Sequence, residues 1–325
     1  MAVYTRLIKE EISKHLENYN IGEFVDFKEI VAGIDNSNFI LETSKQKYIL
    51  TIFESRIQKD ELPLFINFKS HLSQKNICCP KPILSKSGES IVDLKGKKSA
   101  IVTFLSGKTL EPKDNGYYNN ITPKHCFEVG KVLAKLHLAS ADFVETRVND
   151  LGAFGFEKLF NKFSHLVEGY QKGLTAEITE NINLVSNGWN SNLPSAVCHL
   201  DLFPDNVFFD ENSNLSGVID FYFSANDLLI YDFAIIVNAW CFDENNNFSE
   251  EKFLQMLKGY QEVREFSESE KEFLKTSLIS ASMRFLLTRL HDVFFTPKDS
   301  IVNIKNPQEY LEKLRYFTKK YDNKI

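Results

Sequence analysis

The sequence predicts an α+β chain in two lobes, a five-stranded antiparallel sheet with one helix followed by a mainly helical part. Three observations carry this prediction. From residue 24 to residue 54, apolar and β-branched residues recur with a period of two, which is typical of strands, and two further strands fit between residues 90 and 104. After Gly107 the apolar period becomes helical. One segment at residues 206–219 interrupts the helical pattern with an apolar, polar, apolar order that indicates a hairpin.

The N-terminal third is predicted to contain a first helix, five strands and a second helix. Apolar residues at helical spacing, among them Leu7, Ile12 and Leu16, indicate an amphipathic helix over residues 5–18. Pro63 stands in the first turn of the second helix, where a missing N–H is tolerated. The predicted strands are residues 25–32, 36–43, 47–53, 90–94 and 99–104, and the second helix is residues 61–75.

The remaining two thirds of the chain are predicted to be helical around the single hairpin. The strongest helix covers residues 123–139, with Pro123 early and a stripe that includes Val129, Leu133 and Leu136. Further helices are predicted at residues 156–170, 175–190, 227–241, 249–263, 267–295 and 306–322. The change of pattern places the boundary between the lobes near residue 105, which gives lobes of residues 1–105 and 106–325.

Composition excludes several classes of protein. The chain has 325 residues, of which 43% are hydrophobic and 25% charged, with 28 Phe and 12 Tyr, so it has ample material for a core and does not resemble a disordered chain. The net charge of −6 argues against a nucleic-acid surface, because phosphate backbones require clustered Lys and Arg. A nucleotide remains compatible with this charge, since a few local donors and metal ions hold a triphosphate.

Cysteine usage and the N-terminus predict a cytoplasmic protein. The five Cys residues form no CxxC pair and their number is odd, which favours reduced thiols over a disulfide framework or a zinc site. Charged residues follow directly after the first five positions, whereas a signal peptide needs an uninterrupted apolar stretch. No apolar run approaches the roughly 20 residues of a membrane-spanning helix.

One segment has the residue types that phosphoryl transfer requires. His199, Asp201 and Asn206 form a His-x-Asp-x-x-x-x-Asn pattern, and Asp220 follows fourteen residues later after the predicted hairpin. One carboxylate suits the orientation and deprotonation of an acceptor hydroxyl, and an amide oxygen with a second carboxylate suits Mg²⁺. His-x-Asp alone is weak evidence, but the whole pattern before a hairpin is specific. The alternative is a buried structural turn whose carboxylates are satisfied internally.

With these residues the chain resembles the aminoglycoside phosphotransferase and choline kinase-like superfamily, which shares the protein-kinase fold. Within it, the sequence is most similar to the bacterial homoserine kinases. The similarity covers nearly the whole chain, and the N-terminal motifs carry it jointly rather than singly. These motifs are residues 1–5, 33–39, 48–54, 61–63, 79–82 and 220–223. The resemblance implies a protein-kinase-like fold with an N-terminal nucleotide-binding lobe and a C-terminal catalytic and substrate lobe.

The resemblance also implies the cofactors and the central site residues. ATP and Mg²⁺ would be the cofactors and L-homoserine the small-molecule substrate. Asp201 would be the catalytic base, and Asn206 and Asp220 the metal ligands. Residues 33–39 would cover the phosphates, with an ordinary β-turn as the alternative, and the connector near residue 104 would bind adenine through its backbone. The nucleotide-binding candidates from these two segments are Gly33, Asn36, Ser37, Asn38, Thr103 and Leu105.

One position departs from the pattern of the superfamily. Related kinases carry Lys or Arg on the third strand to hold the α- and β-phosphates, and the corresponding residue here is Thr51. Lys47 lies on the same strand face at roughly 13 Å. Arg56 is nearer and is the candidate replacement, with Glu61 as a candidate partner. The phosphate-anchoring cation is therefore left open.

Candidates for substrate binding come after Asp220. Tyr222, Asp227, Asp232 and Arg284 are the candidates: the acids suit an amino group and the guanidinium suits a carboxylate. Three of them have a structural alternative. Asp232 would stabilise the Asp201 segment, Asp227 would do the same or favour a helix N-terminus, and Arg284 would belong to a salt-bridge set on its helix.

Three further residues have structural or mixed interpretations. His137 and His199 are interpreted as packing and orienting groups around the Asp201 segment. Asp205 is open between a metal ligand and a solvated or capping residue. Other acceptors also remain open, namely choline, ethanolamine, an aminoglycoside or a protein Ser/Thr. A non-enzymatic pseudokinase scaffold is the rival class. No nucleic-acid or membrane partner is expected, and the oligomeric state is open.

Overall fold

The computed structural model describes residues 5–30, 36–54, 60–112, 118, 120–297 and 304–321. The chain divides into two compact units. The first comprises Met1–Ser106 with Ser216–Tyr222, and the second comprises Gly107–Leu215 with Phe223–Ile325. A short segment from the later part of the chain therefore belongs to the first unit, and the chain passes from one unit to the other three times.

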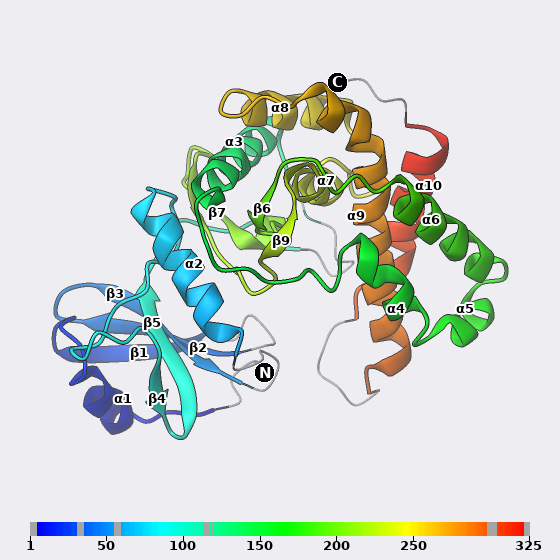
Figure 1. Ribbon diagram of the computed structural model, residues 1–325. Coiled ribbons are helices and arrows are strands. Elements are labelled where there is room, and N and C mark those ends of the chain that lie inside the picture. Colours follow the sequence, from blue (N-terminus) through cyan, green and yellow to red (C-terminus); the bar gives the residue numbers. More distant parts are fainter. Residues whose placement is uncertain are drawn as a thin grey trace. The chain divides into compact units, whose positions relative to one another are not determined.

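The first unit is built on the predicted five-stranded antiparallel sheet, with strand order β1-β2-β3-β5-β4 (Figure 1). Its elements are α1 (Lys9–Leu16), β1 (Phe24–Ile30), β2 (Asn36–Thr43), β3 (Lys47–Phe53), α2 (Leu62–Gln74), β4 (Val92–Leu94) and β5 (Lys97–Thr103). The sequence thus predicted the strands correctly, although β4 is shorter than expected. The first helix begins later than expected, where Glu11 accepts a hydrogen bond from the Ile8 backbone N–H.

Alternation along the strands gives the sheet two apolar faces, each covered by one helix. Leu50 and Ile52 of β3 pack in one cluster with Ile12 and Leu16 of α1. Phe53, one residue further on, points to the other face and packs with Leu62 and Ile66 of α2. Tyr222, from the segment that returns from the second unit, packs against this second cluster.

The second unit is mainly helical, as predicted. Its helices are α3 (Pro123–Ser140), η1 (Ala153–Gly155), α4 (Phe156–Phe160), α5 (Ser164–Tyr170), α6 (Leu174–Gly188), η2 (Pro204–Asn206), α7 (Leu229–Trp240), α8 (Glu250–Gln261), α9 (Glu268–Phe295) and α10 (Pro307–Lys319). The strands of this part of the chain are β6 (Ser195–Cys198), β7 (Val207–Phe209) and β9 (Ala225–Leu228). Strand β8 (Leu215–Val218) lies where the chain returns to the first unit, and the pairs are β6-β9 and β7-β8. The predicted helix at 156–170 is divided into α4 and α5, and β9 takes the start of the predicted helix at 227–241.

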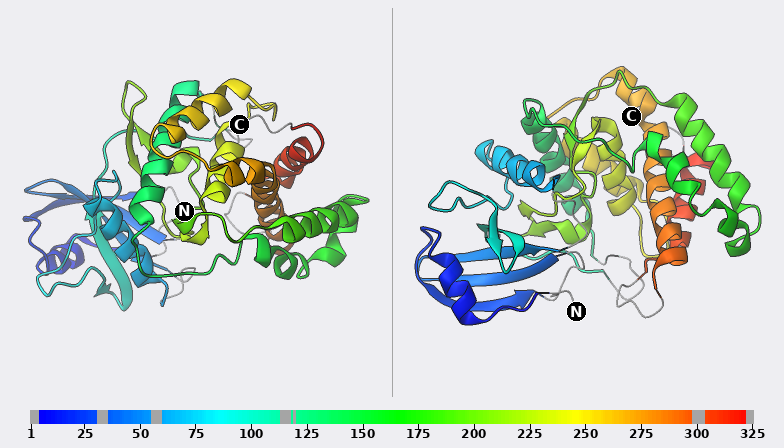
Figure 2. Two further views of the ribbon diagram at one scale, coloured as in Figure 1. Left: turned by 45° about the horizontal axis from the view of Figure 1, so that its top comes forward. Right: turned by 60° about the horizontal axis from the view of Figure 1, so that its bottom comes forward.

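Helix α7 is the centre of the core of this unit, because it is buried almost all round. Helix α9 packs against α7 and α10 (Figures 1 and 2). Helices α3 and α8 approach closely through Gly130 and Gly259, where a Cβ would lie 2.1 Å and 2.0 Å from backbone oxygens of the other helix. Among the described residues, no helix is long and apolar enough to cross a membrane.

Candidate active site

The segment with the His-x-Asp-x-x-x-x-Asn pattern is a loop between β6 and β7 that ends in η2, called here the Asp201 loop (residues 199–206). Strand β6 leads into it and is held by antiparallel pairing with β9, with Ser195 opposite Leu228. Leu200 has φ 62° and is fully buried. A left-handed conformation is uncommon for a residue other than glycine, so the surrounding contacts must hold this turn in place.

The carboxylate of Asp232, on α7, holds the turn from one side. Its Oδ2 accepts a hydrogen bond from the His199 backbone N–H and its Oδ1 accepts one from the Leu200 backbone N–H, both at 2.9 Å. The side chain is completely buried. This geometry supports the structural interpretation of Asp232, since its oxygens are engaged with the backbone rather than open to a substrate.

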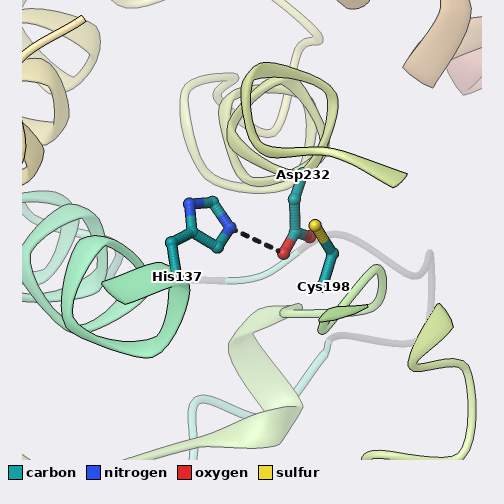
Figure 3. A group of neighbouring side chains, drawn as sticks. All are labelled: His137, Cys198 and Asp232. Carbon is teal, nitrogen blue, oxygen red and sulfur yellow. Dashed lines mark hydrogen bonds and ion pairs between the residues drawn. The ribbon is translucent and has the colours of Figure 1, made fainter. Parts of the chain in front are cut away.

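His137 of α3 supports Asp232 in turn. Its Nε2 lies 3.1 Å from Asp232 Oδ2 (Figure 3). Its Nδ1 lies 2.7 Å from the Tyr260 hydroxyl. Burial opposes the ionisation of Asp232, but the hydrogen bond and charge of His137, followed by His199 and the Leu200 N–H, hold its pKa below the ordinary value. Asp232 is therefore the anionic anchor of the loop.

His137, Asp232 and Cys198 lie close enough together to suggest a metal site (Figure 3). Their other contacts favour a hydrogen-bonded core instead. The imidazole and the carboxylate bond to each other and to further protein groups. Burial raises the pKa of the Cys198 thiol well above its usual range, and this thiol contacts backbone carbonyls such as that of Asp227 at 3.5 Å. A neutral thiol is a poor metal ligand.

Side-chain donors also hold the carbonyl groups of the Asp201 loop. Arg284 Nη1, from α9, donates to the Leu200 carbonyl. Trp240 Nε1 donates to the Leu202 carbonyl and Asn206 Nδ2 to the Asp201 carbonyl, each at 2.8 Å. Arg284 is only 2% exposed, and its guanidinium lies over the Phe285 ring at 4.9 Å. Two opposite charges therefore fix the loop. The Asp232 carboxylate accepts hydrogen bonds from its N–H groups, and the Arg284 guanidinium donates one to a carbonyl.

Two of the three central candidates lie together in the second unit. Asn206 Nδ2 is 3.4 Å from Asp201 Oδ2 in addition to its bond with the Asp201 carbonyl. The third, Asp220, belongs to the first unit and also has a positive φ of 64°. The following residue, Phe221, is fully buried and packs edge-on against Phe68 of α2 at 5.9 Å, which fixes the backbone beside Asp220.

The predicted phosphate-covering residues lie partly outside the described chain. Gly33 and Arg56 fall outside the described residues. Asn36, Ser37 and Asn38 lie in β2 rather than in a loop, and their side chains bond within the sheet. Ser37 Oγ donates to Glu54 Oε1 at 2.7 Å, and Asn38 Oδ1 accepts from Thr51 Oγ1 at 2.7 Å. Their part in phosphate binding stays a prediction.

The connector candidates have a defined local structure. Thr103 ends β5, and its Oγ1 accepts a hydrogen bond from the Lys81 backbone N–H at 2.9 Å. Leu105 follows two residues later and packs on Gly217, where a Cβ would lie 2.5 Å from the Leu105 side chain. Adenine binding by their backbone groups stays a prediction.

Sequence reasoning missed a buried cation in the first unit. Lys69 of α2 is 6% exposed and its Nζ lies 5.3 Å from the centre of the Tyr222 ring. Burial lowers the pKa of Lys69 to about 8, while the charges of Cys79 and Asp220 act in the opposite direction. Tyr222 itself is held edge-on by Phe53 and Phe65. Lys69 stands on a helix whose apolar pattern gives no sign that a cation is buried there.

The remaining substrate candidate, Asp227, is the second residue from the end of β9. Its Oδ2 accepts from Asn149 Nδ2 at 2.6 Å and its Oδ1 from the Leu228 backbone N–H at 2.8 Å. Burial raises the pKa of Asp227 to about 6, against an ordinary value of 3.8, although these hydrogen bonds and Arg284 act in the opposite direction. Burial therefore destabilises the ionised form of Asp227 that is present at neutral pH.

This pKa predicts a specific dependence of stability on pH. The folded protein binds the Asp227 proton more tightly than the unfolded chain does, so ionisation opposes folding. The contribution to stability is fully present below about pH 4 and is lost as the pH rises to about 6, a total of about 3 kcal/mol. Urea unfolding between pH 4 and 7 should show this loss in the wild type but not in Asp227→Asn. Parallel curves for the two proteins would contradict the prediction.

An antiparallel five-stranded unit with a helical unit that carries an Asp and Asn loop defines a phosphotransferase of the protein-kinase-like class. Residues 26–266 match the model of the phosphotransferase enzyme family, so the chain belongs to that family. Curated relatives agree with this. A homoserine kinase of Agrobacterium fabrum is 42% identical over 97% of this chain and 95% of its own, and one of Rhizobium etli is 40% identical over 97% and 96%.

Solved structures show the same fold at low sequence identity. A spectinomycin phosphotransferase in complex with ADP and spectinomycin has a TM-score of 0.67 at 14% identity, covering 98% of this chain and 96% of its own. An amicoumacin kinase in complex with AMP-PNP and Ca²⁺ has a TM-score of 0.67 at 14% identity, covering 97% and 94%. The predicted fold is thereby confirmed.

Proposed function

We propose that this protein transfers the terminal phosphoryl group of ATP to the side-chain hydroxyl of L-homoserine, giving O-phospho-L-homoserine and ADP. This reaction is a step of threonine biosynthesis. The observation that carries the proposal is the similarity to homoserine kinases at 40–42% identity over 97% of the chain. The Asp201 loop supports it, because it carries a carboxylate and an amide close together, the residue types that phosphoryl transfer uses.

Asp201 is the proposed base. Its carboxylate accepts the proton of the acceptor hydroxyl while that oxygen forms a bond to the γ-phosphorus, and ADP leaves with the electrons of the broken P–O bond. Asp232 and Arg284 act as positioning residues, because they fix the backbone on the N-terminal side of Asp201. A base held by buried contacts loses little free energy to reorganisation when the proton moves.

We keep Asn206 and Asp220 as the proposed magnesium ligands on the chemistry of their side chains. Asn206 uses its amide nitrogen for the Asp201 carbonyl, which leaves its amide oxygen as a hard ligand, and Asp220 supplies a carboxylate. Mg²⁺ bound by Asn206 and Asp220 would offset the negative charge of the phosphates. Asp205 is not required for this set and lies in the first turn of η2. The site residues, the cytoplasmic location and the division of roles between the units are parts of this proposal.

A panel of acceptors tests the assignment. Purified protein is incubated with Mg-ATP and one of L-homoserine, choline, ethanolamine, an aminoglycoside or a Ser/Thr peptide, and ADP release is followed, with an acceptor-free reaction as the control. We expect kcat/KM to be highest for L-homoserine. A higher value for any other acceptor would show that the acceptor is misassigned. The absence of Mg-dependent ADP formation with every acceptor would instead favour the pseudokinase scaffold.

A further inference from the structure

A cluster of charges is buried where α9 meets α10 in the second unit. Arg289 of α9 donates from Nη1 to Glu309 Oε2 at 2.6 Å and to the Asn306 carbonyl at 2.8 Å. Lys313 Nζ donates to Glu309 Oε1 at 2.5 Å and to the Asn238 carbonyl at 2.9 Å. Arg289 and Lys313 are 7% and 3% exposed. Two buried cations thus share one carboxylate.

The cluster has an excess of positive charge. Burial opposes the ionisation of Glu309, but Lys313 and Arg289 hold its pKa at about 2, so it is an anion at neutral pH. The Tyr310 ring supports both cations, with its centre 4.5 Å from Lys313 Nζ and from the Arg289 guanidinium carbon. A buried charge without a counter-ion is costly, so an excess cation in the interior favours a bound anion.

A cavity of about 20 Å³ lies next to this cluster. Its lining includes the cations Arg289, Lys305 and Lys313 and the acids Asp243 and Glu309, so that cations still outnumber acids; Phe203 also lines it. Within the described residues, both hydrogen bonds of the Arg289 guanidinium leave from Nη1, so the Nε–Nη2 edge has no protein partner. Such a planar pair of donors matches a carboxylate in a bidentate geometry.

The cavity adjoins the Asp201 loop. Phe203, two residues after Asp201, lines it, and Lys305 Nζ lies 5.4 Å from the centre of the Phe203 ring. Tyr310 gives a second link: burial above all raises the pKa of its hydroxyl, and the charges of Glu309 and Asp201 add to this effect. An acceptor whose hydroxyl is at Asp201 therefore has this positive cavity nearby.

We propose that the free edge of Arg289, assisted by Lys305, binds the carboxylate of the amino-acid acceptor. The inference rests on the proposed function, and it names the group that distinguishes an amino acid from a simple amino alcohol. Arg284, the guanidinium expected from the sequence, is less suited, because its Nη1 holds Leu200 and its side chain is 2% exposed. An acceptor without a carboxylate would leave the positive charge of the cavity uncompensated.

The test compares L-homoserine with 3-amino-1-propanol, which is homoserine without its carboxylate. We expect Arg289→Gln to lower kcat/KM for homoserine about a hundredfold, mainly through KM, and to change kcat/KM for 3-amino-1-propanol and KM for ATP less than about threefold. Arg289→Lys keeps the charge beside Glu309 but loses the bidentate pair, and should lower homoserine kcat/KM about tenfold. Lys305→Gln removes an exposed cation and should cost about fivefold.

Arg315→Gln is the matched control. It removes an Arg of α10 that pairs with Glu177 of α6 outside the cavity, with Nη2 to Oε2 at 2.6 Å, and should leave the ratio between the two acceptors unchanged. Equal losses of kcat/KM for both acceptors in the Arg289 variants would overturn the inference. The cluster would then only hold α9 and α10 together. If Arg289→Gln does not fold, an unchanged ratio in Arg289→Lys and Lys305→Gln overturns it. A wild type that does not phosphorylate homoserine overturns the proposed function as well.

Discussion

Asp201→Asn is expected to lower kcat for homoserine at least about a thousandfold, while the affinity for Mg-ATP changes less than about threefold. The amide has nearly the shape of the carboxylate but accepts no proton, so the acceptor oxygen must attack without a base. The carbonyl of residue 201, which accepts the hydrogen bond from Asn206, is unchanged. The loss should therefore fall on the chemical step and not on folding or nucleotide binding.

Rapid-quench turnover and calorimetric titration with a non-hydrolysable ATP analogue separate these effects. Asp205→Asn is the matched control, because it makes the same change in the same loop at a residue of η2. We expect Asp205→Asn to lower kcat less than about tenfold. Such a result would show that removal of a negative charge from the loop is not by itself enough to stop the reaction. Turnover of Asp201→Asn within tenfold of the wild type would remove Asp201 from the role of base.

The parts of this site that were predictable from the sequence are those with a short-range pattern. The spacing from His199 to Asn206 predicted a loop before a hairpin, and the structure has that loop between β6 and β7. Period-two alternation of apolar residues is also a short-range pattern, and it predicted the strands of the sheet. Strand β9 was not predicted, because Ala225–Leu228 has no alternation of its own and exists by pairing with β6, some thirty residues earlier.

The roles of Asp232 and Arg284 depend on contacts that no local pattern records. Both stand on helices where an isolated polar residue suits a substrate contact as well as a structural one. The structure favours the structural role, because both side chains are buried, Asp232 accepts from the backbone of residues 199 and 200, and Arg284 donates to the carbonyl of residue 200. Conversely, no short-range pattern predicts that Arg289 is buried, because its ion pair is with Glu309 of α10, twenty residues further along the chain.

Asp232→Ala is expected to lower the free energy of unfolding by about 3–5 kcal/mol and to lower kcat strongly in the protein that remains folded. The change leaves the His199 and Leu200 N–H groups buried without acceptors and takes the anionic partner from His137. Leu200 would then relax from its left-handed conformation, and the backbone that carries Asp201 would move with it. Urea unfolding and single-turnover kinetics measure the two effects.

Asp210→Ala gives the matched control for this change, because Asp210 Oδ1 also accepts two backbone N–H bonds, from Asn212 and Asn214 at 2.8 Å, but in an exposed turn. Water replaces the lost acceptor there, so its loss of stability should be much smaller and kcat should be unchanged. His137→Phe separates the contributions further, because it removes the imidazole and keeps both backbone bonds to Asp232. If Asp232→Ala costs no more stability than Asp210→Ala, Asp232 does not anchor the loop, and its place among the substrate-binding candidates is restored.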